Sequence, residues 1–120
     1  MDTRTKIIGA DRVAELAAAG ALIVSGYFDP LVSSLAERLA ELKHPDAPLV
    51  VLIRTPQNPI LPARARAELV AALFVVDYVC DVETTVEPSV SLESEHRQRL
   101  KELIAQVHAR QKAVSPESLR

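Results

Sequence analysis

The sequence predicts an α/β domain in which helices cover both faces of a short parallel sheet of about three strands. Two apolar runs without alternation, at 21–25 and 49–53, are typical of strands buried on both faces. A third run lies at 75–80, and segments with helical spacing separate the three, which indicates βαβ units. With 120 residues, 48% of them hydrophobic and 25% charged, we expect one globular domain over residues 1–120.

Helix boundaries in the first half follow from local patterns. Residues 11–20 are rich in alanine and end on Gly20, which predicts a short helix between the N-terminus and the first strand. Apolar residues recur with helical spacing from Leu31 onward, so a second helix is expected there. Pro45 and Pro48 end that helix before the second strand.

The second half continues the same alternation. The loop at 56–62 is stiffened by prolines, and Pro62 suits the first position of a third helix. After the third strand, Ser91 is expected to begin a long C-terminal helix, about 91–112, with Glu93 in its first turn. The predicted fold is therefore a Rossmann-like three-layer sandwich with a long C-terminal helix.

Charge and composition exclude several classes of function. The net charge of -2 argues against a nucleic-acid partner, which needs a basic patch. No apolar run approaches the roughly 18 residues that span a membrane. The single cysteine, Cys80, is expected to be a small buried hydrophobe and suits a reducing cytoplasm. The three histidines show no metal-ligand spacing, so no metal site is predicted.

Four segments carry a recognisable pattern, in this order: Gly26-Tyr-Phe-Asp-Pro-Leu31, Pro59-Ile-Leu-Pro62, Arg66 with Leu69-Val-Ala-Ala-Leu73, and Val76-Asp-Tyr-Val79. Together they resemble the cytidylyltransferase-like nucleotidyltransferases, and most closely the sugar-phosphate and glycerol-phosphate nucleotidyltransferases. The resemblance covers about residues 6–82. It implies a nucleotide-binding fold and transfer of a nucleotidyl group to a sugar or polyol phosphate.

The chain departs from that family where the chemistry would take place. The family pattern continues with two histidines that bind the nucleotide phosphates, and here Val32, Ser34 and Leu35 occupy that stretch. The family also has a loop lysine, whereas no lysine lies between Lys43 and Lys101. The family's later strands and serine/threonine-rich phosphate motif are missing as well. Phosphoryl-type transfer depends on positioning and charge stabilisation, so these losses predict that catalysis is lost.

Seven residues are candidates for ligand binding: Gly26, Tyr27, Phe28, Asp29, Ser33, Ser34 and Arg54. Each has a structural alternative. Gly26 can serve a tight turn, and Phe28 can be a core aromatic. Asp29 either orients the turn or contacts a ligand or its metal. Ser33 and Ser34 can donate to a phosphate or simply face solvent. Arg54 follows the second strand, at the edge where doubly wound folds bind ligands.

Arg66 is expected to form a structural ion pair. By helical spacing it shares a face with Leu69 and Val70, which predicts a half-buried guanidinium. A half-buried cation needs an anionic partner, and the candidates are Asp77, which we favour, and Asp29. A contact between Arg66 and a substrate is the alternative.

The predicted C-terminal helix carries an apolar stripe that must pack against another surface. The stripe consists of Leu92, His96, Leu100, Leu103, Ile104, Val107 and Val114. The stripe could pack on the domain's own sheet or on a partner chain. Because a short sheet also leaves strand edges exposed, we expect a homodimer formed through this helix or a sheet edge.

The sequence therefore predicts a cytoplasmic, non-catalytic nucleotidyltransferase-like protein. It would bind a nucleotide or phosphorylated small molecule weakly, or act as an interaction module, and would require no cofactor. Two alternatives stay open. One is an active cytidylyl- or adenylyltransferase that uses Ser33, Ser34 and Arg54 with Mg²⁺ in place of the histidines. The other is a structural or regulatory dimer partner.

Overall fold

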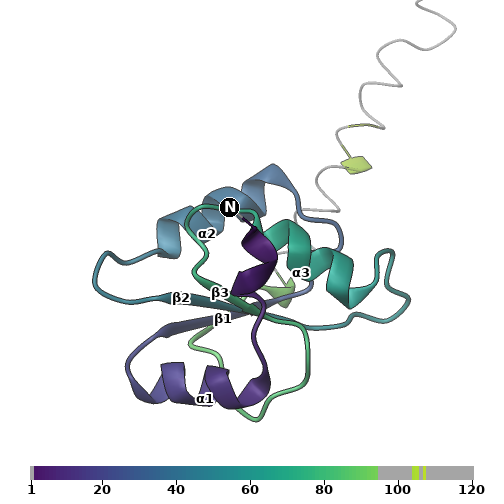
Figure 1. The fold of residues 1–120 in the computed structure, drawn as a ribbon. Coiled ribbons are helices and arrows are strands. Elements are labelled where there is room, and N and C mark those ends of the chain that lie inside the picture. The colour runs from purple at the N-terminus through teal and green to yellow at the C-terminus, as the bar shows by residue number, and fades with distance from the viewer. Residues whose placement is uncertain (1, 95–103, 106, 108–120) are drawn as a thin grey trace, which may run out of the picture.

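The computed structural model describes residues 2–94, 104, 105 and 107 (Figure 1). Its elements are the 3-10 helix η1 (Thr3–Lys6), α1 (Ala10–Ala18), β1 (Leu22–Gly26), α2 (Ser33–Leu42), β2 (Leu49–Ile53), α3 (Ala63–Ala71), β3 (Tyr78–Cys80) and β4 (Val90–Ser91). The strands form one parallel sheet in the order β3-β2-β1-β4. The predicted α/β class with a parallel sheet is confirmed. No helix in the described ranges is long and apolar enough to cross a membrane.

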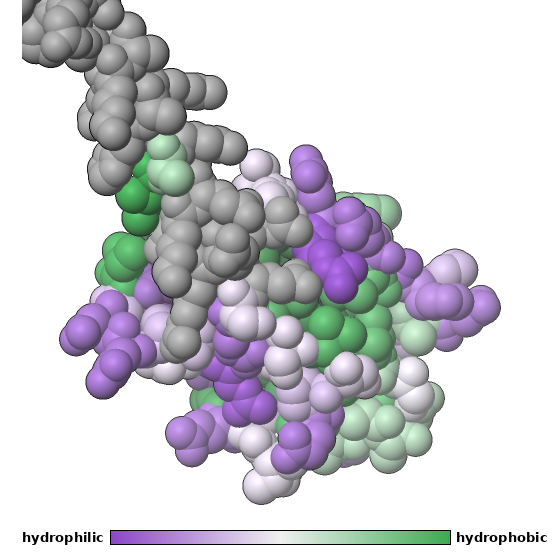
Figure 2. All heavy atoms as spheres, turned by 180° about the vertical axis from the view of Figure 1, so that it is seen from behind, coloured by the Kyte–Doolittle hydropathy of each residue, from purple (hydrophilic) through white to green (hydrophobic). Residues whose placement is uncertain are grey.

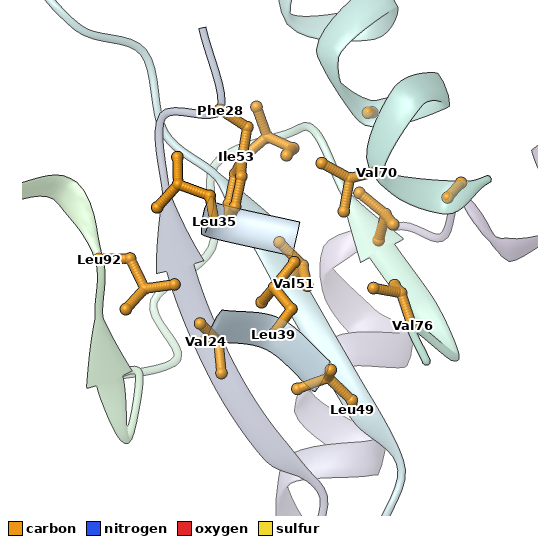
Figure 3. Close-up of a cluster of buried hydrophobic side chains, with 13 residues drawn as sticks. Val24, Phe28, Leu35, Leu39, Leu49, Val51, Ile53, Val70, Val76 and Leu92 are labelled. Carbon is orange, nitrogen blue, oxygen red and sulfur yellow. The ribbon is translucent and has the colours of Figure 1, made fainter. Parts of the chain in front are cut away.

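Both faces of the sheet are covered, as the unalternating apolar runs predicted. α1 lies on one face, and α2 and α3 lie on the other (Figure 1). Successive residues of a strand point to opposite faces, so Val24 packs with the α2 and α3 side while its neighbour Ile23 packs with α1. Figure 3 shows the larger of the two cores, in which Leu35 and Leu39 of α2 meet Val51 of β2.

A fourth strand was missed by the sequence analysis. Val90 and Ser91 pair in parallel with Val24 and Ser25 of β1, so Ser91 ends a strand, and helical conformation begins two residues later than predicted, at Glu93. The backbone N–H of Leu92 then donates to the carbonyl of Ser25 over 2.7 Å. Leu92 is fully buried against the larger core. The extended conformation is favoured at Val90 and Ser91 because it pairs backbone groups along the open edge of β1 and buries Leu92.

Most of the predicted C-terminal helix lies outside the described residues. Of its apolar stripe, the structure describes Leu92, Ile104 and Val107, and the last two are about half exposed. The other members of the stripe fall in the part of the chain that is not described.

The outer edge of β3 is partly covered by the N-terminal segment. Ile7 bridges to Val79, and the N–H of Ile8 donates to the Val79 carbonyl over 2.8 Å. β3 is also shorter than the predicted run of 75–80, because the N–H of Val76 bonds the carbonyl of Leu73 in a turn. This edge offers little free backbone for pairing with another chain.

Candidate functional site

The carboxyl ends of β1, β2 and β3 meet at one edge of the sheet, where ligands bind in open α/β folds. A cavity of about 390 Å³ lies at this edge. Its lining consists of Tyr27, Ile53, Arg54, Thr55, Asp81, Val82, Glu83 and Glu93. It therefore combines one guanidinium with three carboxylates.

A larger hollow of about 720 Å³ lies near the opposite ends of β2 and β3, and both lysines that line it, Lys6 and Lys43, are engaged within the protein. Lys6 Nζ donates to the carbonyls of Leu73 and Val76, at 3.1 and 2.8 Å. Lys43 Nζ donates to Asp77 Oδ2 over 2.7 Å. Because both lysines are already bound by groups of the protein, the cavity at the carboxyl edge is the better candidate site.

Tyr27 and Arg54 are the two predicted ligand-binding residues that line the carboxyl-edge cavity. Arg54 directly follows β2 and is half-buried. Ser33 and Ser34, at the start of α2, do not line it; Ser33 is exposed and Ser34 half-buried.

Gly26 and Phe28 have the structural roles that were their alternatives. A Cβ at Gly26 would lie 2.5 Å from Cε2 of Phe28, so no larger residue fits without moving the ring. Phe28 is 1% exposed and holds a left-handed backbone conformation, with φ of 48°. The turn after β1 is thus built to insert an aromatic ring into the core.

Asp29 binds the protein's own loop. It is 3% exposed, and its carboxylate accepts the N–H of Ile60 at 2.6 Å and the N–H of Leu61 at 2.7 Å. Each carboxylate oxygen therefore already accepts one backbone donor. Asp29 thereby holds the proline-rich loop at 56–62 against the end of β1.

Arg66 is buried, at 1% exposure, and donates mainly to backbone carbonyls. Nε donates to Leu61 over 3.0 Å, and Nη1 donates to Tyr27 at 3.0 Å and Arg54 at 2.7 Å. Arg66 thereby ties the ends of β1 and β2 to the loop that Asp29 holds. Leu61 lies between the two charges, since its N–H binds Asp29 and its carbonyl binds Arg66.

The predicted ion pair between Arg66 and Asp77 is wrong. Asp77 instead contacts Lys43 Nζ and the N–H of Leu49, both at 2.7 Å. The physical reason is topological: Arg66 faces the carboxyl end of the sheet, whereas Asp77 precedes β3 at the amino end. None of the ion pairs found among the described residues involves Arg66.

Away from the exposed surface, the pKa values of Asp77 and Cys80 are shifted by their surroundings. Partial burial by itself raises the pKa of Asp77, but hydrogen bonds from Lys43 and the Leu49 N–H outweigh it and hold that pKa below its ordinary value. Burial raises the pKa of the Cys80 thiol. Cys80 is fully buried in the core beside α1, as predicted for a small hydrophobe.

Val32 and Leu35, which stand where the resemblance would place two histidines, are packing residues. Val32 caps α2 without a side-chain hydrogen bond and packs on the larger core. Leu35 is fully buried in that core (Figure 3). Neither side chain can donate to a phosphate.

Sequence reasoning missed the acidic part of the cavity. Ser25 Oγ, buried within β1, donates to Glu93 Oε1 over 2.8 Å, which brings Glu93 to the site. Asp81 directly follows β3 and contacts Arg64 over 3.6 Å. Asp81 could have been selected by the rule that selected Arg54, because each directly follows a strand. Ser25 could have been selected because it is a polar residue within an apolar run. Glu93 could not be placed without β4.

In the described ranges, no group of three or more His, Cys, Asp or Glu side chains is arranged to hold a metal ion. A comparison with protein-family models finds no match for this chain, and a comparison with curated proteins finds no significant one.

Proposed function

We propose that this chain is a non-catalytic protein with a Rossmann-like, nucleotidyltransferase-like fold that acts in the cytoplasm as a binding module. The observation that carries the proposal is that the residues of the turn after β1 and of the start of α2 are already engaged within the protein. Leu35 is buried where a phosphate-binding histidine would stand, and both oxygens of Asp29 are bound to the loop. The family's segments are kept, but they serve packing.

Binding of a nucleotide or phosphorylated small molecule is expected to be weak. Arg54 is the cationic side chain that lines the cavity, and it shares the lining with Asp81, Glu83 and Glu93. Carboxylates repel a phosphate, so the local field opposes the attraction of Arg54. The N-terminus of α2, with Ser33 and Ser34, can still attract an anion through free N–H groups.

The test is a pyrophosphate-release assay with CTP and ATP, Mg²⁺, and a panel of sugar and polyol phosphates. We expect no turnover above background, because two imidazole donors are missing and one such donor is worth roughly 2.7–4 kcal/mol. Turnover that disappears in Arg54→Ala or in the double variant Ser33→Ala/Ser34→Ala would establish the histidine-free transferase instead.

A role as a structural or regulatory dimer partner is the second candidate, and exposed apolar side chains favour it. Phe74 is 97% exposed, and Ile60, Ile104 and Val107 are exposed by about half or more. Figure 2 shows hydrophobic side chains at several places on one face of the molecule. Because Ile104 and Val107 lie three residues apart, they share a helical face that a second copy can cover.

A further inference from the structure

The charges that line the carboxyl-edge cavity are separated from one another. Arg54, Glu83 and Glu93 all line it, yet none of the ion pairs among the described residues includes any of the three. Opposite charges that share a cavity without touching leave room for a ligand that carries both signs. We propose that this cavity binds a small zwitterion with a carboxylate at Arg54 and an ammonium group at Glu93. The inference uses the binding site of the proposed function, but it does not depend on the loss of catalysis.

The positive side of the cavity is supported by a buried group. Nη2 of Arg66 carries two hydrogens, and its contact in the described structure is Thr55 Oγ1 at 3.4 Å, a long hydrogen bond. Thr55 lines the cavity, and Arg66 is 1% exposed. A buried guanidinium with donor capacity to spare therefore lies behind Thr55, beside Arg54. A ligand carboxylate in the cavity would meet Arg54 and Thr55, which line it, with the positive charge of Arg66 behind them.

The negative side is held in place by β1. Ser25, fully buried, donates to Oε1 of Glu93 and leaves Oε2 without a hydrogen bond in the described part of the chain. Glu83 faces the same cavity from the segment after β3. A carboxylate that is oriented by a buried hydroxyl and open at one oxygen is suited to accept from an ammonium group.

The balance of charge selects a carboxylate over a phosphate. Asp81 is compensated by Arg64, so the remaining lining has two carboxylates for one guanidinium. A dianionic phosphate would add net negative charge to this lining, whereas a zwitterion adds no net charge. Arg54 follows β2 and Glu93 follows β4, with β1 between them, so they belong to strands roughly 10 Å apart. The longer ω-amino acids should fit this separation better than glycine.

The experiment is a titration of the full chain, followed by amide chemical shifts, with glycine, 4-aminobutyrate and 6-aminohexanoate. Acetate, propylammonium and inorganic phosphate serve as the single-charge and phosphate probes. We expect 4-aminobutyrate or 6-aminohexanoate to bind at least about tenfold more tightly than acetate or propylammonium. Glu93→Gln should weaken the zwitterion about tenfold and leave acetate unchanged, and Arg54→Gln should abolish the response to acetate.

Glu37→Gln and Arg12→Gln, at exposed positions on α2 and α1, are the matched controls and should bind like the unmodified chain. Urea unfolding of each variant shows whether it is folded. The proposal is overturned if the zwitterions bind no better than their single-charge halves, if phosphate binds more tightly than they do, or if Glu93→Gln binds normally. Such results leave the non-catalytic proposal standing, because only pyrophosphate release would remove that one.

Discussion

At the scale of single residues, the strongest organising feature is the pair of buried charges that hold the loop at 56–62. Asp29 binds two N–H groups of this loop, and Arg66 binds one of its carbonyls together with carbonyls from the ends of β1 and β2. Buried charges are costly unless their polar atoms are satisfied, and here the backbone satisfies most of them. Both residues belong to the segments on which the resemblance to nucleotidyltransferases rests, yet both act on the protein's own backbone.

Arg66→Ala should destabilise the fold by about 3 kcal/mol or more, because several buried carbonyls lose their donor at once. Arg64→Ala is the matched control on the same helix. Arg64 is 57% exposed, and its contacts with Glu68 and Asp81 are 3.7 and 3.6 Å long, so its loss should cost less than about 1 kcal/mol. Urea unfolding measures both. Equal losses for the two variants would show that the Arg66 network contributes little.

Gly26→Ala should also destabilise, by roughly 1–3 kcal/mol, because the new methyl group would clash with the Phe28 ring. Gly9→Ala is its control, since nothing lies within 4 Å of a Cβ there and φ is -87°. The control should change stability by less than about 1 kcal/mol. If Gly26→Ala melts like the control, the ring moves aside freely and the tight-turn interpretation fails.

At the scale of elements, a charge contact joins the end of α2 to the sheet. Lys43 follows α2 and contacts Asp77, which in turn accepts the N–H of Leu49 at the start of β2. Because the pKa of Asp77 is lowered in the fold, the contact stabilises the protein above about pH 4, the ordinary range of an aspartate. This stabilisation is lost as pH falls through the lowered pKa, since the unfolded chain takes up the proton first.

The prediction is that Asp77→Asn costs stability at pH 7 and that its difference from the unmodified chain shrinks below about pH 4. The side chain is 39% exposed, so solvent screening limits the effect to about 1 kcal/mol or less. Asp46→Asn, at an exposed carboxylate near Lys43, is the control. Chemical unfolding at several pH values decides the matter, and a difference that stays constant down to pH 2 would contradict the role given to the carboxylate.

At the scale of the whole molecule, we expect a homodimer at micromolar concentration. Because Ile7 partly covers the β3 edge, we expect the dimer to form through the apolar face that includes Ile104 and Val107. The double variant Ile104→Lys/Val107→Lys should be monomeric by light scattering. Ala105→Lys, at an exposed position outside the apolar stripe, should stay dimeric. A monomeric unmodified chain would remove the dimer proposal.

The sequence by itself determined the layered α/β class, because unbroken apolar runs and helical spacing are local signals. It also determined the burial of Cys80 and the packing role of Leu35, since both lie within apolar patterns. The roles of Arg66 and Asp77 were decided only by tertiary structure. Helical spacing predicted a half-buried Arg66, whereas the side chain is 1% exposed, and the spacing could not show that its partners are carbonyls from three separate segments.

The acidic half of the cavity was likewise decided by long-range contacts. β4 pairs with β1 across more than sixty residues of chain, and this pairing carries Glu93 to Ser25. A two-residue strand has no periodicity to detect, and its stability comes from the open edge of β1 and the burial of Leu92. Local patterns therefore specify the longer helices and strands, whereas the short strand β4 and the charge around the site depend on which distant segments meet.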